Sequence, residues 1–419
     1  MTAAGPTGQT PAFDGWARLR EQAARAGVDV EAAEAAADEH AAKWVARTDP
    51  GARVGQLHHT VPKFYLDGFA DTRDFLAVRD RVTGRLRRQR TDSLGQRDFY
   101  TSIDDDGKLD AQLEDLLGVV EQWAAPSLRK LRGLLPGLLP GLPEEERAAL
   151  ATLLAFQCVR GPRFRRRAEL VVEYQAKLGL RSPPTAKKNR SGRRHSAGLT
   201  SSGLVDAELA ALHIAPDPNE HLRLLTVARE LYPYLALRPV TVVHLAGPLL
   251  VTGDEPVVVG DARDRDCHRP ECALPARLRE KRARRAVQRG RPSTEVVHFR
   301  DAAGAGLAEA EQVWVPLTPW RLLLLGPLDA SARPELILDQ ACSDAVAAEC
   351  NAAVVAQSYS WVAAHPAHPD FVGMPLPAPG PLLQVCDGGS LLSRSLEGAP
   401  VPRAPQRRRP SDILRVASP

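Results

Sequence analysis

The chain contains few of the residues and segments that would define a common functional class. Its 419 residues include two methionines and six scattered cysteines, and aromatic residues make up only 5%. A chain of this length does not need a disulfide framework, so we expect free thiols. No apolar run approaches the roughly 20 residues of a membrane span, and the first residues lack the basic and apolar regions of a secretory signal. We therefore expect a cytoplasmic protein that does not enter a membrane.

Motifs of several enzyme classes are also missing. The patterns G-x-G-x-x-G, G-x-x-x-x-G-K and G-x-S-x-G are absent, so dinucleotide-binding, P-loop and α/β-hydrolase functions have no motif support. The segment "CHRPEC" from Cys267 to Cys272 supplies two thiols and an imidazole. No second Cys or His pair lies nearby to complete a tetrahedral zinc site, so a zinc function there is disfavoured.

The positive charge is unevenly distributed. The formal net charge is +4, and arginine-rich stretches at 186–194, 276–291 and 401–419 carry more than this whole excess. None of the three contains an aromatic residue on which a base could stack. They predict at most a weak, salt-dependent contact with nucleic acid or another anionic ligand. The alternative interpretation is that they are solvated loops.

Hydrophobic periodicity outlines the order of the elements. Residues 74–90 read as two strands around a Thr83-Gly84 turn. From Leu109 apolar residues recur at helical spacing, and a second long helix is predicted from Pro143 through Val171. Another helix is predicted over 218–236. Apolar strand-like runs follow between 240 and 325. The last helix is predicted from about Asp339 to Val355, followed by "SYSWVAAH".

This order predicts an α+β fold. We expect an N-terminal β-hairpin, a helical middle and a C-terminal, mainly antiparallel sheet with a flanking helix. The expected domain covers 52–370 and has flexible insertions at 181–203 and 262–292. Residues 1–51 are a variable helical extension, and the Pro- and Arg-rich tail 371–419 is expected to be disordered.

Seven stretches, taken together and in this order, resemble a bacterial family, the domain of unknown function 4238, over about residues 56–365. They read "HHTVPKFYLDGFA", "VTGRLRRQ" with "RDFYT", "VVEQWAAPSLRKL", "LLAFQCVRGPRFR", "LLVTGDEPVVV", "VWVPLTPWRLLLL" and "ECNAAVVAQSYSWV". His58 stands where the family usually has glutamine, and Gly253 and Glu255 replace the usual Ser and Asn beside Asp254. The resemblance implies fold and membership and brings no activity.

Three residues in these stretches are candidates for catalysis. His59 precedes a predicted helix, whose dipole keeps the imidazole neutral and suited to act as a base or metal ligand. Glu121 lies on the flank of the apolar stripe of its helix. Asp254 follows a strand-like run, a common place for a carboxylate that polarises water or holds a metal ion. Each also has a structural interpretation: a helix entry, a surface ion pair and a turn.

Two further residues are candidates for ligand binding. Gln157 falls within the apolar stripe that Leu150, Leu153 and Leu154 define, so we expect a buried amide. Arg160 lies at the edge of that stripe, and its guanidinium could bind an oxygen-rich ligand through two parallel hydrogen bonds. The alternative is an internal network that ties the helix to the sheet.

These residues leave two functions open. The first is a hydrolase that activates water and acts on phosphodiesters, because the set offers a base, acids and an anion-binding group but no nucleophile fixed by spacing. This reaction class could use a divalent metal ion as cofactor. The second is a non-catalytic module that binds an anionic ligand or nucleic acid. For both functions we predict that all five residues, His59, Glu121, Gln157, Arg160 and Asp254, lie in one cleft.

Overall fold

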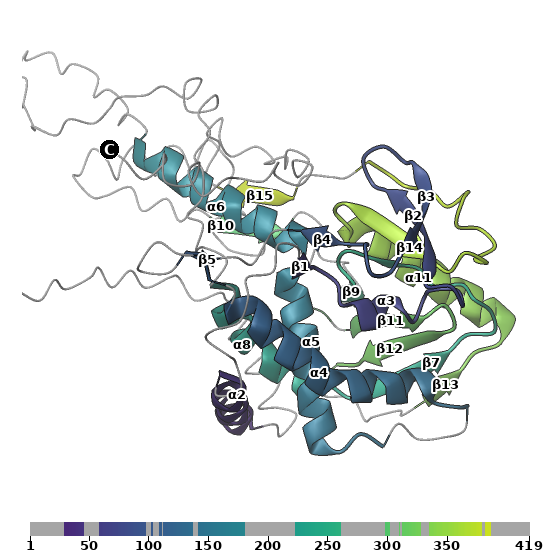
Figure 1. The fold of residues 1–419 in the computed structure, drawn as a ribbon, viewed down its shortest axis with the longest axis horizontal. Coiled ribbons are helices and arrows are strands. Elements are labelled where there is room, and N and C mark those ends of the chain that lie inside the picture. Colours follow the sequence, from purple (N-terminus) through teal and green to yellow (C-terminus); the bar gives the residue numbers. More distant parts are fainter. Residues whose placement is uncertain are drawn as a thin grey trace, which may run out of the picture.

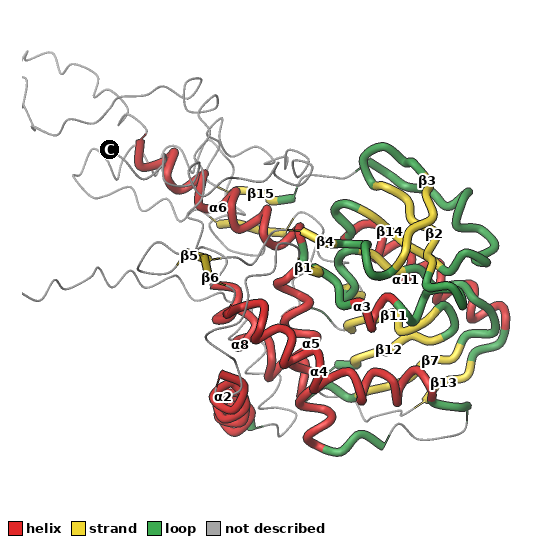
Figure 2. The backbone as a smooth tube through the Cα atoms, in the orientation of Figure 1, coloured by secondary structure: helices red, strands yellow, loops and turns green. Residues whose placement is uncertain are grey.

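The computed structural model describes residues 29–45, 58–97, 102–103, 109–110, 112–136, 141–180, 223–260, 298–301, 310, 312–327, 335–378 and 382–386. It confirms the α+β class, since helices and two mainly antiparallel sheets occupy different parts of the fold (Figure 1; Figure 2). The insertions predicted at 181–203 and 262–292 lie outside the described residues, as do 387–419. The proposed domain limits therefore stay a prediction.

Helix α5 (Glu144–Arg160) begins where the sequence predicts. Three glutamates occupy its first turn, where the positive end of the helix dipole favours acidic side chains. Nearly every residue in the rest of the helix is buried. The reason is that α5 packs against three other helices (Figure 1), namely α4 (Gln112–Gly133), α6 (Pro162–Leu180) and α8 (Arg223–Ala236).

The single long helix predicted from 143 to 171 is wrong, because the chain turns between α5 and α6. Gly161 has extended backbone angles, φ −68° and ψ 154°, and α6 starts at Pro162. Proline lacks the N–H that would continue the helix, and its ring disfavours helical angles in the residue before it. The resulting α5–α6 corner places Arg160 at the end of one helix and Arg163 in the first turn of the next.

Two sheets form the other half of the fold. The four-stranded sheet has the order β3-β2-β14-β8, with β2 Phe75–Asp80, β3 Leu86–Arg90, β8 Thr252–Gly253 and β14 Trp361–Ala364. The five-stranded sheet has the order β13-β7-β12-β11-β9, with β7 Val240–His244, β9 Val258–Gly260, β11 Gln312–Thr318, β12 Arg321–Leu325 and β13 Glu335–Ile337. All pairings in them are antiparallel except β13 with β7.

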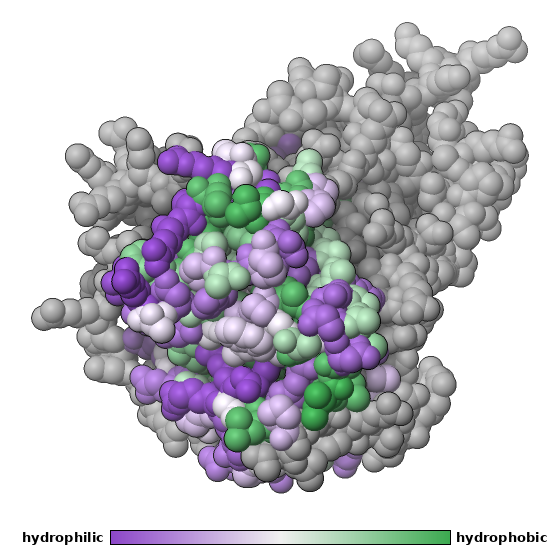
Figure 3. Space-filling view, turned by 90° about the vertical axis from the view of Figure 1, so that its right-hand side faces the viewer, coloured by the Kyte–Doolittle hydropathy of each residue, from purple (hydrophilic) through white to green (hydrophobic). Residues whose placement is uncertain are grey.

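The predicted hairpin is formed by β2 and β3. Gly84 in its turn has φ +67°, a backbone conformation that favours glycine, and the carboxylate of Asp80 accepts hydrogen bonds from the N–H groups of Val82 and Thr83. Strand β3 is an edge strand whose residues are mostly exposed. Figure 3 shows the face on the right of Figure 1, where hydrophilic side chains alternate with smaller hydrophobic areas.

The segment "SYSWVAAH" follows the helix predicted from about Asp339 to Val355, whose limits the structure nearly reproduces. Helix α11 (Gln340–Gln357) stops before it, and residues Trp361–Ala364 form β14, which is fully buried between β2 and β8. The β-branched and aromatic residues Val362 and Trp361 suit a buried strand. Because its partners lie about 280 and 110 residues earlier in the chain, local periodicity gives no indication of this pairing.

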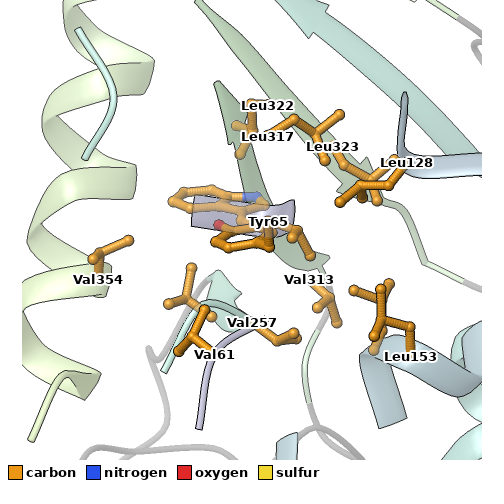
Figure 4. Packing of buried hydrophobic residues seen from close by; sticks show 14 of the residues in the cluster. Val61, Tyr65, Leu128, Leu153, Val257, Val313, Leu317, Leu322, Leu323 and Val354 are labelled. Atoms are coloured by element: carbon orange, nitrogen blue, oxygen red, sulfur yellow. The ribbon is translucent and has the colours of Figure 1, made fainter. Parts of the chain in front are cut away.

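One hydrophobic core joins the helices to both sheets within the described residues, and Figure 4 shows the side chains around Tyr65 in it. The hydroxyl of Tyr65 donates to the carbonyl oxygen of Pro316 at 2.5 Å and lies 3.1 Å from the hydroxyl of Thr252. Arg132 donates to the carbonyl oxygen of Leu317 at 3.0 Å and also to those of Phe64 and Tyr65. These bonds connect α3 (Lys63–Leu66) to α4 and both sheets.

The remaining described elements are short or peripheral. They are α2 (Val30–Val45), β1 (His58–His59), β4 (Gln96–Arg97), β5 (Ser102–Ile103), β6 (Leu109–Asp110), β10 (His298–Asp301) and β15 (Leu383–Cys386). Strand β15, within the tail predicted to be disordered, pairs with β10. Within the described part of the chain, no helix has the length and apolar character needed to cross a membrane.

Candidate functional site

Glu121 and Arg160, both predicted as site residues, meet in an ion pair between α4 and α5. The Nη1 atom of Arg160 donates to Oε1 of Glu121. The Arg160 side chain is only 2% exposed, whereas that of Glu121 is 22% exposed. A guanidinium removed from water in this way needs an anionic partner. The pair therefore places a positive group in the interior with a carboxylate between it and the surface.

A second carboxyl group on α4, that of Glu114, belongs to the same cluster. Glu114 is seven residues, or two helical turns, before Glu121 and so lies on the same face. Burial raises the pKa of Glu114 to about 7; the Arg160 charge opposes this rise, and the Glu121 and Asp115 charges add to it. Its Oε2 atom is buried and has no hydrogen-bond partner in the described structure. Our sequence reasoning missed Glu114, although the seven-residue spacing could have indicated it.

Gln157 is buried, as predicted, with 4% of its surface exposed. Neither its Oε1 nor its Nε2 atom has a hydrogen-bond partner among the residues that the structure describes. A buried amide without partners costs about 1–3 kcal/mol relative to a paired one. The predicted internal network through Gln157 is therefore not formed with described residues.

Asp254 lies in the turn between β8 and β9, and both of its carboxylate oxygens accept backbone hydrogen bonds. The N–H of Tyr359 donates to Oδ1 at 2.8 Å and the N–H of Ser360 donates to Oδ2 at 2.5 Å. Burial raises the pKa of Asp254 to about 6, while these hydrogen bonds act in the opposite direction. These contacts hold the segment that follows α11. Both donors lie more than 100 residues from Asp254, so these bonds are long-range contacts and not the local turn bonds of the alternative interpretation.

The neighbouring Glu255 reaches the α5–α6 corner and was not predicted. It is buried, and its Oε1 atom accepts a hydrogen bond of 2.8 Å from the N–H of Arg163. Burial and the nearby charge of Asp254 raise the pKa of Glu255 well above its usual value, against the charges of Arg163 and Arg167. In the sequence Glu255 is only part of a turn, and no nearby residue pattern indicates its hydrogen bond with the N–H of Arg163.

His59 is placed in β1, and its Nε2 atom lies 3.0 Å from the carbonyl oxygen of Asp92. The next residue, Thr60, bonds to the carbonyl oxygen of Gly95, and a side chain at Gly95 would touch the ring of Trp361. The carbonyl oxygen of Trp361 in turn accepts from the N–H of Asp254. The segments carrying His59 and Asp254 are thus linked through β14, and their use in one cleft stays a prediction.

The described residues give little support for a cysteine nucleophile or for a metal site. Burial raises the pKa of the Cys158 thiol to about 12, which keeps it protonated and a poor nucleophile. Within the described ranges, no group of three or more His, Cys, Asp or Glu side chains is arranged to hold a metal ion. The "CHRPEC" segment lies outside those ranges. The divalent metal ion considered for a hydrolase therefore has no ligand set here and stays a prediction.

The fold and the site define an α+β protein in which carboxyl groups and arginines gather at the junction of its central helices. The model of the family described as "Protein of unknown function (DUF4238)" matches residues 57–280. The chain belongs to this family, as its motifs suggested. No curated protein and no solved structure matches the chain.

Proposed function

We propose that the cluster around Arg160 is the active site of a hydrolase that acts on phosphodiesters by general acid–base catalysis. The observation that supports this proposal best is the arrangement of α4 and α5. Two carboxyl groups on one face of α4 accompany a buried guanidinium, and one turn away lies the buried amide of Gln157, which has no partner among the described residues. A structural ion pair alone would not explain the amide.

The two carboxyl groups suit opposite proton-transfer roles. Glu121, paired with Arg160, takes a proton from water, and the water oxygen forms the new bond to phosphorus. Glu114, with a pKa of about 7, holds a proton near neutral pH and gives it to the leaving oxygen as the old phosphorus–oxygen bond breaks. Arg160 and Gln157 would donate hydrogen bonds to the non-bridging phosphate oxygens.

The other two predicted catalytic residues have more limited parts in this proposal. His59 is a second base that could relay the proton. Asp254 already uses both oxygens on backbone N–H groups, so it supports the site by holding the segment after α11. The protein is proposed to act in the cytoplasm, and the arginine-rich stretches would add a salt-dependent attraction to phosphate.

The proposal is tested by measuring hydrolysis with the purified protein. The substrates are bis(p-nitrophenyl) phosphate, single-stranded RNA and single-stranded DNA, each with Mg²⁺, with Mn²⁺ and with a chelator. We expect turnover that Glu121→Gln lowers by about 10²- to 10⁴-fold. Glu145→Gln changes an exposed glutamate in the first turn of α5 and should leave turnover unchanged.

Absence of turnover on every substrate, or equal turnover by Glu121→Gln and the normal protein, would contradict the hydrolase. Salt-dependent binding of the nucleic acids without turnover would then favour the anion-binding module. In that module Arg163 is a poor candidate for ligand contact, because its guanidinium donates to the carbonyl oxygens of Ala356 and Gln357.

A further inference from the structure

Glu255 lies against the first turn of α6 more closely than any residue other than glycine would permit. A Cβ atom on Gly161 would lie 2.0–2.2 Å from the carboxyl atoms of Glu255. The backbone angles of Gly161 are ordinary for other residues, so the glycine is needed for space and not for conformation. The carboxylate thereby reaches the N–H of Arg163 and satisfies one of the free donors at the start of α6.

Arg163 makes the complementary contact at the end of another helix. Its Nη1 atom donates to the carbonyl oxygens of Ala356 and Gln357 at 2.9 and 3.1 Å. These are the last residues of α11, where carbonyl groups lack partners within the helix and the dipole favours a positive charge. One residue thus joins the start of α6 to the end of α11.

Asp254 closes this set of contacts into a ring. It binds the N–H groups of Tyr359 and Ser360, just after α11, and it is covalently joined to Glu255. The ring therefore runs from Glu255 to Arg163, to the end of α11, to the segment that follows it, and back through Asp254. Its non-covalent steps are all hydrogen bonds to backbone groups, which fix positions more firmly than contacts between two flexible side chains.

We infer that Glu255 and Arg163 are positioning residues that fix the α5–α6 corner and hold Arg160 and Gln157 in place. Arg160 directly precedes Gly161, so a shift of the corner would move its guanidinium away from Glu121. This inference rests on the proposed function for its purpose, since the aligned groups are the proposed phosphate ligands. Neither Glu255 nor Arg163 is proposed to touch the substrate.

The experiment uses the Nε–H NMR signal of Arg160 in the full chain, assigned by its loss in Arg160→Lys. Removing the carboxylate in Glu255→Ala should shift or broaden this signal and lower the Tm by about 1–3 °C. Acetate, which can occupy the space left by the side chain, should restore the signal in Glu255→Ala and have no effect on the normal protein. Glu145→Ala, at an exposed position, should leave the Arg160 signal unchanged.

An unchanged Arg160 signal in folded Glu255→Ala, or no recovery with acetate, would overturn the positioning role and leave Glu255 only a stabilising residue. If Glu255→Ala does not fold, the Arg160 signal of Glu255→Gln tests the positioning role instead. Its amide oxygen can still accept from the Arg163 N–H, so the signal should persist, and its loss would contradict the inference. None of these readouts uses turnover, so failure of the proposed hydrolase would be seen separately.

Discussion

Replacing Gln157 with methionine is expected to raise the free energy of unfolding. The two amide atoms are buried without partners in the described structure, so removing them relieves an unfavourable desolvation of about 1–3 kcal/mol. Methionine is unbranched and similar in size, and such changes of shape usually cost less than about 1.5 kcal/mol. The net expectation is a gain of about 1 kcal/mol, together with weaker binding of phosphate or a phosphodiester.

Urea unfolding measures this effect, and the m-value should stay unchanged because the fold is the same. Thr152→Val is the matched control on the same helix, since Thr152 is equally buried but its hydroxyl donates to the carbonyl oxygen of Ala148 at 2.8 Å. Thr152→Val should lower stability by about 0.5–1.5 kcal/mol. If Gln157→Met destabilises the protein as Thr152→Val does, the amide has partners and is not reserved for a ligand.

Three more predictions follow from the same cluster. Burial raises the pKa of Glu114 from 4.5 to about 7, so between these pH values the folded state keeps a proton that the unfolded chain releases. The free energy of unfolding should therefore fall as the pH rises from 4.5 to about 7. Thermal unfolding measured as a function of pH should show a flatter slope for Glu114→Gln. Gly161→Ala should destabilise the protein by about 1–3 kcal/mol in urea, and adding Glu255→Ala should reduce that effect, because the new methyl group collides with the Glu255 carboxyl. Asp254→Asn should cost about 1–3 kcal/mol, since its amide NH₂ would face a backbone N–H; equal Tm values for the two proteins would contradict this role.

The parts of the fold that depend on neighbouring residues could be predicted from the sequence. The hairpin was predicted from its Thr-Gly turn, and α5 from its acidic first turn and apolar stripe. The bend at Gly161 was missed because the apolar and charged pattern continues across the Gly-Pro pair. Strand β14 was missed because its character depends on β2 and β8, which are distant in sequence.

Some features of the site could likewise be predicted from the neighbouring sequence, and others could not. Burial of Gln157 follows from helical geometry alone, and the flank position of Glu121 allowed the ion pair with Arg160 that the structure has. Glu255 could not be predicted as a site residue, since its contact with Gly161 joins residues 94 positions apart and depends on how the sheet docks on the helices.

The most direct measurement of the central claim is a crystal structure of the protein grown with tungstate, an analogue of phosphate located by its anomalous scattering. The account predicts a peak within hydrogen-bonding distance of the guanidinium of Arg160 and the amide of Gln157, and no peak there in Gln157→Met crystals. Saturating tungstate that leaves this position empty, or that binds only at the exposed arginines of β3, would contradict it.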